Sequence, residues 1–571
     1  MKRSKKLLTA AVSALMLTAP GTILITPEVA SFNAKAIDDT GDDWLHAKGS
    51  RLYDMNGNEV WLTGANWFGY NCTECALHYL WSGDIDDLVC SIADRGINVL
   101  RIPVSTELLY NWMIGDPDPM KSINPNDDPS YYFNADLINE DGSVMNSMES
   151  FDVLLKLCKK YGVKVFIDIH SPESNNSGHN YGLWYGKSFT GRDGKDITVD
   201  TELWIKTLAW TAEHYKGDDT LIGFDLKNEP HSTYGGAPVD AIWDTSDAEN
   251  NWRKAAEDCA NAILKENPNA LIFIEGVEGY KGHGAWWGGN LRGVADCPVV
   301  PESGTSQIVY SPHDYGPIVS AQTWFEKDFT EQTLLDDYWY DTWAYIVDKD
   351  IAPLLIGEWG GRMDGGDNEK WMRLIRDYMI KNHINHTFWC LNDDSGDTGG
   401  LWKDISFDGT SGKTNINWDE EKYELFEPSL WQTLKSGKYI GLDHNTPLGV
   451  NGTGLSLNEF YTSYASSEGS NIDGGKTSTG NPVHTDPSTS GSDDSTGGNV
   501  VWGDANEDNE VNLADAVLIM QNIANPTKYK ITQQGKLNGD VDENGDGITP
   551  NDAFKIQQFV LGIISALDPN A

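Results

Sequence analysis

The stretch LIGFDLKNEP, residues 221–230, begins as an apolar run and ends in Asn228, Glu229 and Pro230. Its first half does not alternate apolar and polar side chains, which is typical of a parallel strand buried on both faces. The sequence therefore predicts a buried parallel strand here, and seven other stretches share its pattern. They are 60–67, 98–104, 163–170, 270–276, 307–315, 352–360 and 386–392.

Helical patterns lie between most of these strands. Eight strands with crossovers predict an α/β fold, a (β/α)8 TIM barrel, as the catalytic domain over residues 41–446. An open doubly wound sheet is the alternative, but no GxGxxG turn follows an early strand. The predicted helices are 84–95, 148–161, 200–216, 250–267, 333–349 and 368–383, whereas the Gly-rich stretch 277–306 has no clear helix.

Polar and ionisable side chains stand where the predicted strands end. In such a barrel the C-terminal strand ends form the active site, so Glu229 and Glu358 would converge there. Two carboxyl groups about 5–5.5 Å apart are the machinery of a retaining glycosidase. Each residue alone also fits a structural role, for example His170 in the core or Glu358 at the surface. Their joint occurrence after buried runs favours an active site.

The region from about 50 to 440 resembles glycoside hydrolase family 5, and specifically its bacterial endoglucanases that act on β-1,4-glucans. The family pattern of eight active-site residues is complete in this sequence. The segments that carry the resemblance are GANWFGYN (64–71), RGINVLRIPVS (95–105), IDIH (167–170), LKNEP (226–230), WWGGNL (286–291), SPHDYG (311–316), IGEWG (356–360) and WCLNDDSGDTGGL (389–401).

The resemblance implies a role for each of these residues. Glu229 resembles the acid/base and Glu358 the nucleophile, and no cofactor is needed for catalysis. Arg101 and Tyr315 would hydrogen-bond the nucleophile and keep it ionised. The other four bind substrate: Asn228 would hold the sugar 2-hydroxyl, His170 and His313 would orient the acid/base and the sugar, and Trp389 would lie under the sugar.

Two finer expectations concern the cleft. A general acid must stay protonated beside an ionised neighbour, so we expect the charge of Glu358 to raise the pKa of Glu229. Six tryptophans are candidates for outer sugar-binding subsites, although any one of them also fits a place in the core. They are Trp67, Trp81, Trp184, Trp286, Trp287 and Trp402.

Other functions remain open at this point. The same fold could cut mannan or a mixed-linkage or branched glucan, because one hydroxyl configuration at an outer subsite decides the substrate. A catalytically inactive, sugar-binding scaffold subunit is a further alternative, and the retention of both glutamates argues against it. A metal hydrolase is disfavoured because no HExxH motif is present, and His170 and His179 lie too far apart for one helical turn.

The composition disfavours some classes of binding partner and favours others. The chain has 571 residues and a formal charge of −44, which disfavours nucleic acid or an anionic membrane surface as a partner. With 22 Trp and 23 Tyr, flat apolar ligands such as sugars are favoured.

The N-terminus has the pattern of an export signal. A basic start precedes the apolar run 7–17, and Ala34 and Ala36 flank a cleavage point, so residues 1–36 are predicted to be a signal peptide. A transmembrane anchor is the weaker alternative, because the apolar run is short and prolines interrupt its continuation. The protein is thus expected to be secreted and extracellular.

The cysteines number seven, so at least one is unpaired. Disulfides are possible in a secreted chain but too sparse here to sustain the core. Cys72-x-x-Cys75 could be half of a redox or zinc site, yet no second CxxC or clustered histidine accompanies it in the sequence, which favours a structural role.

The composition changes near the C-terminus. Residues 447–500 are predicted to be a linker rich in Ser, Thr and Gly, although the sequence gives no clear role to 447–464. Two similar acidic loops follow, each preceding a predicted helix (513–524 and 551–562), and their oxygen-bearing side chains are spaced as calcium ligands. The second loop is one residue longer. The predicted ligands are Asp504, Asn506, Asp508, Asn512 and Asp515, and then Asp540, Asp542, Asn544 and Asp552.

A duplicated loop and helix after such a linker resembles the dockerin module of cellulosomes, here over residues 501–567. The resemblance implies a small all-α domain that needs structural calcium to fold and binds a cohesin module of a scaffold protein. A calcium-buffering EF-hand pair and a solvated acidic tail are the alternatives. Apolar residues on the two helices oppose the tail.

Overall fold

The computed structural model describes residues 43–123, 132, 134–408, 413–472, 502–506, 511–524, 529–541, 548–560, 564 and 567. The chain forms two compact units, one up to residue 482 and one from 483 onward. The predicted signal peptide and most of the predicted linker lie outside the described residues. Among those that are described, no helix has the length and apolar composition needed to cross a membrane.

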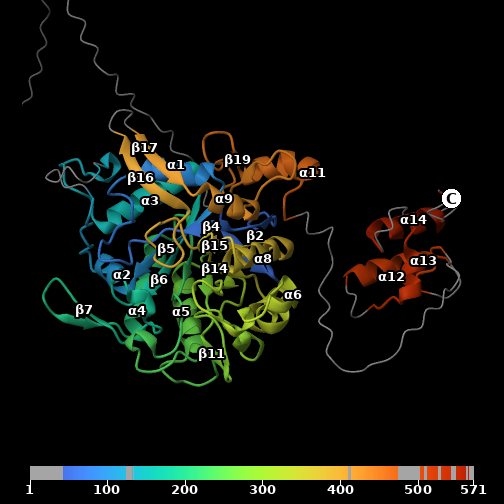
Figure 1. Cartoon of the computed structure of the whole chain (residues 1–571), viewed down its shortest axis with the longest axis horizontal. Coiled ribbons are helices and arrows are strands. Elements are labelled where there is room, and N and C mark those ends of the chain that lie inside the picture. Colours follow the sequence, from blue (N-terminus) through green and yellow to red (C-terminus); the bar gives the residue numbers. More distant parts are fainter. Residues whose placement is uncertain are drawn as a thin grey trace, which may run out of the picture. The chain divides into compact units, whose positions relative to one another are not determined.

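Eight parallel strands form the centre of the first unit (Figure 1). Each strand pairs with its neighbours in sequence except β13 and β14, which are the two edges of the sheet, and β15 also pairs with β4. Isolated parallel bridges Tyr310–Leu354 and His313–Glu358 join the remaining edges, so the sheet closes into the predicted barrel. The strands are β4 (Thr63–Asn66), β5 (Val99–Ser105), β6 (Lys164–Ser171), β9 (Leu221–Asp225), β10 (Leu271–Ile274), β13 (Ile308–Tyr310), β14 (Leu355–Trp359) and β15 (Asn385–Phe388).

Helices surround the barrel in the predicted order, and every barrel-strand residue is buried. The prediction that 277–306 has no long helix is confirmed, since this described segment holds only the hairpin β11 (Gly279–Tyr280) and β12 (His283–Gly284) and a helical turn at Arg292–Ala295. The helices are α1 (Ile85–Asp94), α2 (Thr106–Met113), α3 (Ser147–Tyr161), α4 (Thr201–His214), α5 (Trp252–Glu266), α6 (Glu331–Leu334) continuing through π-helical turns into α7 (Tyr345–Asp348), α8 (Asp367–Asn382) and α9 (Glu420–Phe426).

Small sheets that were not predicted decorate the barrel. The antiparallel sheet β1 (Leu45–Lys48), β2 (Arg51–Asp54) and β3 (Glu59–Val60) precedes the first barrel strand. Its residues Leu45, Leu52 and Val60 pack in one apolar cluster with Val99 and Phe166 from barrel strands. This cluster seals the N-terminal end of the barrel. The other pairs are β7 (Ser188–Thr190) with β8 (Asp196–Thr198), β16 (Trp402–Asp408) with β17 (Lys413–Trp418), and β18 (Tyr439–Ile440) with β19 (Gly454–Leu455).

The predicted boundary at residue 446 falls too early. Leu455, Leu457, Phe460 and Ile472 are buried in the same cluster that seals the barrel. They belong to β19, α10 (Leu457–Glu459), the π-helical turns that follow, and the segment after α11 (Ala465–Glu468). Residues 447–472 are therefore part of the catalytic unit, because regularly spaced apolar side chains inside a Ser-rich stretch bury against it.

A buried ion network lies at the N-terminal end of β6. Lys164 Nζ lies 2.7 Å from Asp43 Oδ2 and within 3.9 Å of carboxylate oxygens of Asp219 and Asp443. His444 joins the network, with Nδ1 2.6 Å from Asp43 Oδ1 and Nε2 2.9 Å from Asp54 Oδ2. The network ties β6 to segments that lie far from it in the sequence.

The second unit is described by α12 (Leu513–Ala524), α13 (Gln533–Gly539) and α14 (Pro550–Val560). Ala516 and Ile519 from α12 pack against Ala553 and Ile556 from α14 around a small apolar core. The helix predicted at 513–524 is thus present, and the one predicted at 551–562 is present as far as 560, its last two residues lying outside the described residues. The helix α13 between them was not predicted.

Candidate active site

All eight predicted site residues lie at the C-terminal end of the barrel, because each stands within or just after a barrel strand. Arg101 is in β5, His170 in β6 and Glu358 in β14. The remaining five follow a strand end directly: Asn228 and Glu229 after β9, His313 and Tyr315 after β13, and Trp389 after β15.

Glu358 is buried and held by two donors. Arg101 Nη1 donates to its Oε1 at 2.8 Å, and the Tyr315 hydroxyl donates to its Oε2 at 2.7 Å. Each oxygen of the carboxylate thus has its own partner, which fixes the plane of the group. These are the two contacts that were predicted for this residue.

Glu229 has a different environment. Its φ of 49° lies in the left-handed region, which is unusual for a residue with a Cβ atom. Its backbone N–H donates to Glu275 Oε2 at 2.7 Å, and its side-chain Oε1 accepts from His313 Nδ1 at 3.0 Å. Backbone strain of this kind persists only where surrounding contacts fix it, and Glu275 and His313 supply them.

The predicted rise in the pKa of Glu229 is wrong for the free protein. Burial does raise the pKa of this carboxyl, but the hydrogen bond and charge of His313 outweigh burial and bring it below its ordinary value. His313 is buried too, yet the charges of Glu275 and Glu358 raise the pKa of its imidazole well above the usual range. The prediction considered repulsion between two glutamates and missed the imidazolium between them.

The two glutamates approach each other closely. One carboxylate oxygen of Glu229, one of Glu358 and a ring nitrogen of His313 lie within 4.8 Å of one another. His313 Nδ1 is 3.5 Å from Glu358 Oε2 as well as 3.0 Å from Glu229 Oε1.

Arg101 is the shared partner of four buried carboxylates. Besides Glu358, its guanidinium nitrogens lie 2.9 Å from Asp225, 3.1 Å from Asp168 and 3.2 Å from Glu275. Sequence reasoning missed these three acids as site residues. Glu275 directly follows the apolar run 270–274, so the signal that singled out the other strand-end residues was available for it.

The three missed acids retain protons more readily than free carboxyls do. Burial, opposed by the charge of Arg101, raises the pKa of Asp168 and of Asp225 to about 7. Burial also raises the pKa of Glu275 to about 8, against the opposing charge of His313. Buried Lys227 shifts the other way, to about 8. The site thus holds several groups that exchange protons near neutral pH.

His170 and Trp389 form one wall of the site. Asp168 Oδ2 lies 2.6 Å from His170 Nδ1, and burial lowers the pKa of this imidazole well below its usual value, so the ring is neutral. Its ring stacks on Trp389 with centroids 5.4 Å apart and planes 4° apart. Trp389 also stacks with Phe68, whose ring centroid is 5.6 Å from that of Trp389.

The six outer tryptophans divide into two groups. Trp67, Trp184 and Trp402 are fully buried, so their prediction as subsite candidates is wrong. Trp67 packs edge-on against Trp402, from a distant part of the sequence, in the main core. Trp81 and Trp287 are partly exposed, and Trp286 is 7% exposed, so these three remain candidates. Trp287 stacks on His231 with centroids 3.9 Å apart.

The predicted calcium ligands are described only in part. Asp508, Asp542 and Asn544 lie outside the described residues. Asp515 accepts backbone N–H bonds from Asn506 and Asn512, at 3.1 and 2.9 Å.

The other loop repeats this arrangement. Asp552 accepts backbone N–H bonds from Val541 and Thr549, at 2.6 and 2.7 Å. Thr549 is the counterpart of Asn512 in the repeat, whereas Val541 lies one position before the counterpart of Asn506, so the two aspartates hold their loops in a similar way. Asp504, Asn506, Asn512 and Asp540 are described in the same loops.

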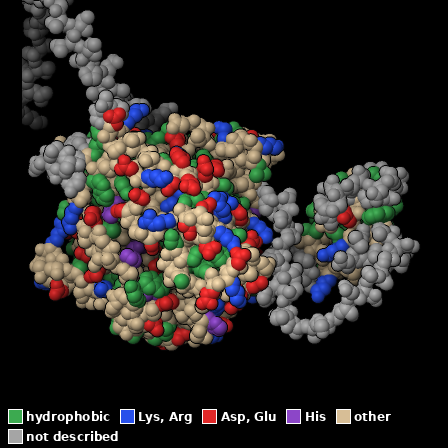
Figure 2. All heavy atoms as spheres, in the orientation of Figure 1, with side chains coloured by type: hydrophobic (Ala, Val, Ile, Leu, Met, Phe, Trp, Pro, Cys, Tyr) green, Lys and Arg blue, Asp and Glu red, His purple; other side chains and the backbone are tan. Residues whose placement is uncertain are grey.

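The surface of the first unit mixes charges. On the face seen in Figure 2, Asp and Glu side chains are interspersed with Lys and Arg. The formal charge of −44 thus does not gather into one block on this face.

Comparison with known proteins agrees with this geometry. The family described as Cellulase (glycosyl hydrolase family 5) matches residues 53–395. Endoglucanase G of Acetivibrio thermocellus is 52% identical over 543 residues, covering 90% of this chain and 91% of the relative. Endoglucanase B of the same organism is 42% identical, covering 80% of this chain and 84% of the relative.

Solved structures of an endocellulase and of an endoglucanase are also similar to this chain. An endocellulase from Pyrococcus horikoshii, in complex with cellotetraose, matches with a TM-score of 0.55 and 30% identity over 68% of this chain and 98% of its own. The catalytic domain of the major endoglucanase from Xanthomonas campestris matches with a TM-score of 0.54 and 27% identity, over 67% of this chain and 99% of its own.

Proposed function

The chain belongs to the cellulases of glycosyl hydrolase family 5 and is an endoglucanase, and on that premise we propose that it cuts internal β-1,4 bonds of cellulose with retention of configuration. The observation that carries the stereochemistry is the proximity of Glu229 and Glu358, whose oxygens lie within 4.8 Å. Retaining enzymes keep their carboxyl groups about 5–5.5 Å apart, whereas inverting enzymes need about 6.5–9.5 Å to admit a water.

Glu358 is the proposed nucleophile. Arg101 and Tyr315 orient its carboxylate, so an oxygen can attack the anomeric carbon while the bond to the leaving oxygen breaks. The product of this step is a glycosyl ester on Glu358 and a shortened glucan. Water then attacks the same carbon, frees Glu358 and releases the sugar with its original configuration.

Glu229 is the proposed acid/base. Its carboxylate and the imidazolium of His313 share a hydrogen bond of 3.0 Å, so the pair holds the proton that the leaving oxygen needs. Transfer from Nδ1 to Oε1 gives Glu229 its acid form. In the second step Glu229 takes a proton from the attacking water.

The remaining residues position the sugar. Asn228 Oδ1 accepts a hydrogen bond from Arg101 at 3.1 Å, which fixes the orientation of the amide. Its NH₂ group is then left to donate to the 2-hydroxyl of the sugar. Trp389, whose ring contacts His170 and Phe68, provides the apolar face under the sugar ring.

Hydrolysis of carboxymethylcellulose and of galactomannan by wild type and Glu358→Ala tests the proposal. We expect release of reducing ends from the cellulose derivative, lost in the variant, and NMR of the first product should show the β-anomer. Activity on mannan alone would replace the substrate and keep the mechanism. An α-anomer first product would exclude retention, and silence of wild type on both polymers would favour an inactive sugar-binding subunit.

The protein is further proposed to be secreted, with removal of the basic and apolar N-terminal segment 1–36. Support comes from the composition of that segment. Edman sequencing of protein from the culture medium tests this, and a first residue near Ile37 is expected.

The second unit is proposed to be a calcium-dependent dockerin that attaches the enzyme to a cohesin of a scaffold protein. The residues fit the ion, because Asp504, Asp515 and Asp552 are buried carboxylates in two acidic loops, and Ca²⁺ prefers such oxygen ligands. Bound calcium would offset the negative charge of the loops, and the helices α12 and α14 would then present the surface for the partner.

Calorimetry of the full chain tests the dockerin assignment. Calcium should raise the unfolding temperature of one transition and leave that of the larger catalytic transition unchanged. The variant Asp515→Asn should reduce this effect. Binding to immobilised cohesins should require calcium, and binding that is equal with and without the ion would contradict the proposal.

A further inference from the structure

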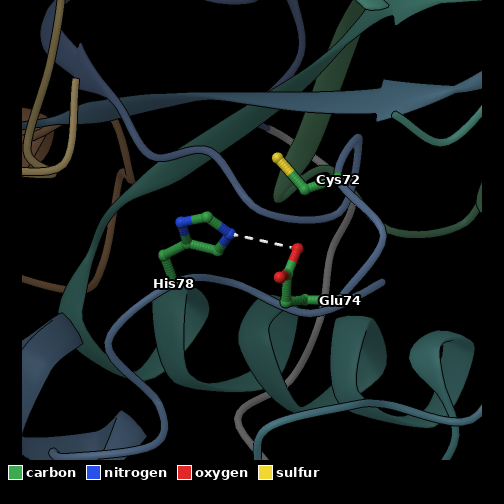
Figure 3. Close-up of side chains that lie close together, drawn as sticks. All are labelled: Cys72, Glu74 and His78. Atoms are coloured by element: carbon green, nitrogen blue, oxygen red, sulfur yellow. Dashed lines mark ion pairs between the residues drawn. The ribbon is translucent and has the colours of Figure 1, made fainter. Parts of the chain in front are cut away.

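Three side chains of the segment after β4 converge on one space outside the catalytic residues. One ligand atom each of Cys72, Glu74 and His78 lies within 4.8 Å of the others, and a dashed line in Figure 3 joins the His78 ring to the Glu74 carboxylate. His78 Nε2 lies 3.6 Å from Glu74 Oε2. Nitrogen and oxygen ligands of one tetrahedral ion lie roughly 3.3 Å apart, so this pair already has nearly the required spacing.

The histidine carries a second, independent indication. Its side chain is 7% exposed, and Nε2 is a buried atom without a hydrogen-bond partner. Its other nitrogen, Nδ1, lies 2.6 Å from Asp394 Oδ2. A carboxylate that holds one ring nitrogen and leaves the other without a hydrogen bond is the arrangement that orients histidine ligands of metals.

We propose that Cys72 Sγ, Glu74 Oε2 and His78 Nε2 bind a zinc-class transition metal ion, with a solvent molecule as the fourth ligand. Thiolate, imidazole and carboxylate together suit zinc, whereas calcium takes oxygen ligands. Cys75, the other member of the CxxC motif, is not part of this set. The sequence pattern pointed to the wrong partner because Glu74 and His78 are brought together only by the fold of the loop.

Binding changes the protonation of the cysteine. A cysteine binds such an ion as the thiolate. When the ion binds, the S–H bond breaks, the proton leaves to solvent and the sulfur lone pair forms the bond to the metal. Affinity should therefore increase with pH.

The ion would brace a wall of the cleft. Cys72 packs with Phe68 and Cys390 in one small apolar cluster, against which Trp389 packs. His78 also meets Phe68 at a centroid distance of 5.0 Å. Two of the three ligands thus contact the ring that stacks on Trp389, so a bound ion would restrict the motion of this stack.

Cobalt(II) titration of the full-length, calcium-saturated protein tests the proposal without using activity. Cobalt replaces zinc and gives a thiolate-to-cobalt charge-transfer band in the near ultraviolet only when a cysteine sulfur binds it. We expect this band in wild type, its loss in Cys72→Ser and its displacement by zinc. Cys297→Ser, which removes a cysteine outside the cluster, is the matched control and should retain the band.

Two further variants test the site if Cys72→Ser fails to fold. Glu74→Gln, at a partly exposed side chain, should weaken cobalt affinity while the band persists. Asp394→Asn should weaken it by about 10–100-fold. Absence of the band in wild type, its survival in Cys72→Ser, or a thiol assay that finds Cys72 in a disulfide of the secreted protein would overturn the proposal.

Discussion

Strand β6 joins two buried ion networks of opposite character. At its N-terminal end Lys164 meets three aspartates, and those carboxylates also accept backbone amides: Asp443 from Asn445 and Thr446, and Asp219 from Asp43. At its C-terminal end Asp168 belongs to the group of acids around Arg101.

The difference lies in how the oxygens are satisfied. One oxygen each of Asp168 and Asp225 is buried without a hydrogen bond, although both acids pair with Arg101. Backbone amides hold the lower carboxylates in one place, although burial raises the pKa of Asp219 and of Asp443. The upper acids lack such amide contacts at one oxygen each, and burial raises the pKa of Asp168 and of Asp225 to about 7. The lower network therefore serves stability and the upper one serves chemistry, as barrels generally divide these tasks. The following changes test that division.

The largest effect is expected at the nucleophile. Glu358→Gln should lower kcat on carboxymethylcellulose by roughly 10⁴-fold or more, because no covalent intermediate can form. Its unfolding temperature should stay the same or rise, since the change removes a charge from a crowded group of acids. Glu302→Gln, at an exposed glutamate, is the control and should retain activity. A strongly destabilised Glu358→Gln would contradict the assignment of the upper network to chemistry and not to stability.

The next effect separates the two glutamates. Glu229→Ala should lower hydrolysis of the polymer by about 10²–10⁴-fold, the usual contribution of a general acid. Formation of the glycosyl intermediate from 2,4-dinitrophenyl cellobioside should be nearly unchanged, because that leaving group needs no proton. Burst kinetics measures this step, and equal losses on both substrates would contradict the assignment.

The lower network should respond in stability alone. Lys164→Met leaves buried carboxylates without their cation and should reduce the free energy of unfolding by about 3–5 kcal/mol. The kcat of the molecules that remain folded should stay within about twofold of wild type. Lys370→Met, at a surface ion pair with Asp328, should cost at most about 1 kcal/mol. Urea unfolding and active-site titration give both quantities.

Two glycines allow a matched test near the catalytic residues. Gly288 has a φ of +68°, and a Cβ atom there would lie 2.1 Å from Glu275 Oε2 and 3.2 Å from Glu229 Cα. Gly282 has a φ of +83° and open space around it. Both changes to alanine carry backbone strain of about 1–2 kcal/mol. Only Gly288→Ala should also lower kcat/KM, by about 10-fold or more, because it displaces Glu229. Similar kinetics for the two variants would contradict the inference that Gly288 positions Glu229.

The last prediction is a pH dependence of stability from His444. Its hydrogen bonds to Asp43 and Asp54 raise its pKa to about 10 from an ordinary value of 6.5. The folded state therefore binds this proton more tightly, and the stabilisation is complete below pH 6.5 and lost as the pH rises to about 10. The unfolding temperature of wild type should fall over that range more than that of His444→Gln. Parallel curves for the two proteins would contradict the role of His444.

The sequence predicted the barrel well because buried parallel strands leave a local signal. Runs such as 163–170 and 352–360 are apolar whatever their partners are, and the residue that ends each run faces the cleft by geometry. Glu229 and Glu358 were found in this way, as were the donors to Glu358.

What the sequence could not supply depends on distant contacts. The burial of Trp67 results from packing against Trp402, and neither segment shows this by itself. The lowered pKa of Glu229 depends on a histidine from another strand. Residues 454–472 have a composition close to that of the linker, and only their burial assigns them to the barrel.

Arg101 also constrains how this enzyme can be engineered. Four acids from four different strands share one guanidinium, so replacing any one of them redistributes charge among the other three. A library that varies these positions one at a time would meet mostly inactive variants, and their effects would not add. To obtain a new pH optimum, two or more of the acids should instead be changed together. Alternatively, Arg101 and its four acids can be kept and the surrounding loops varied.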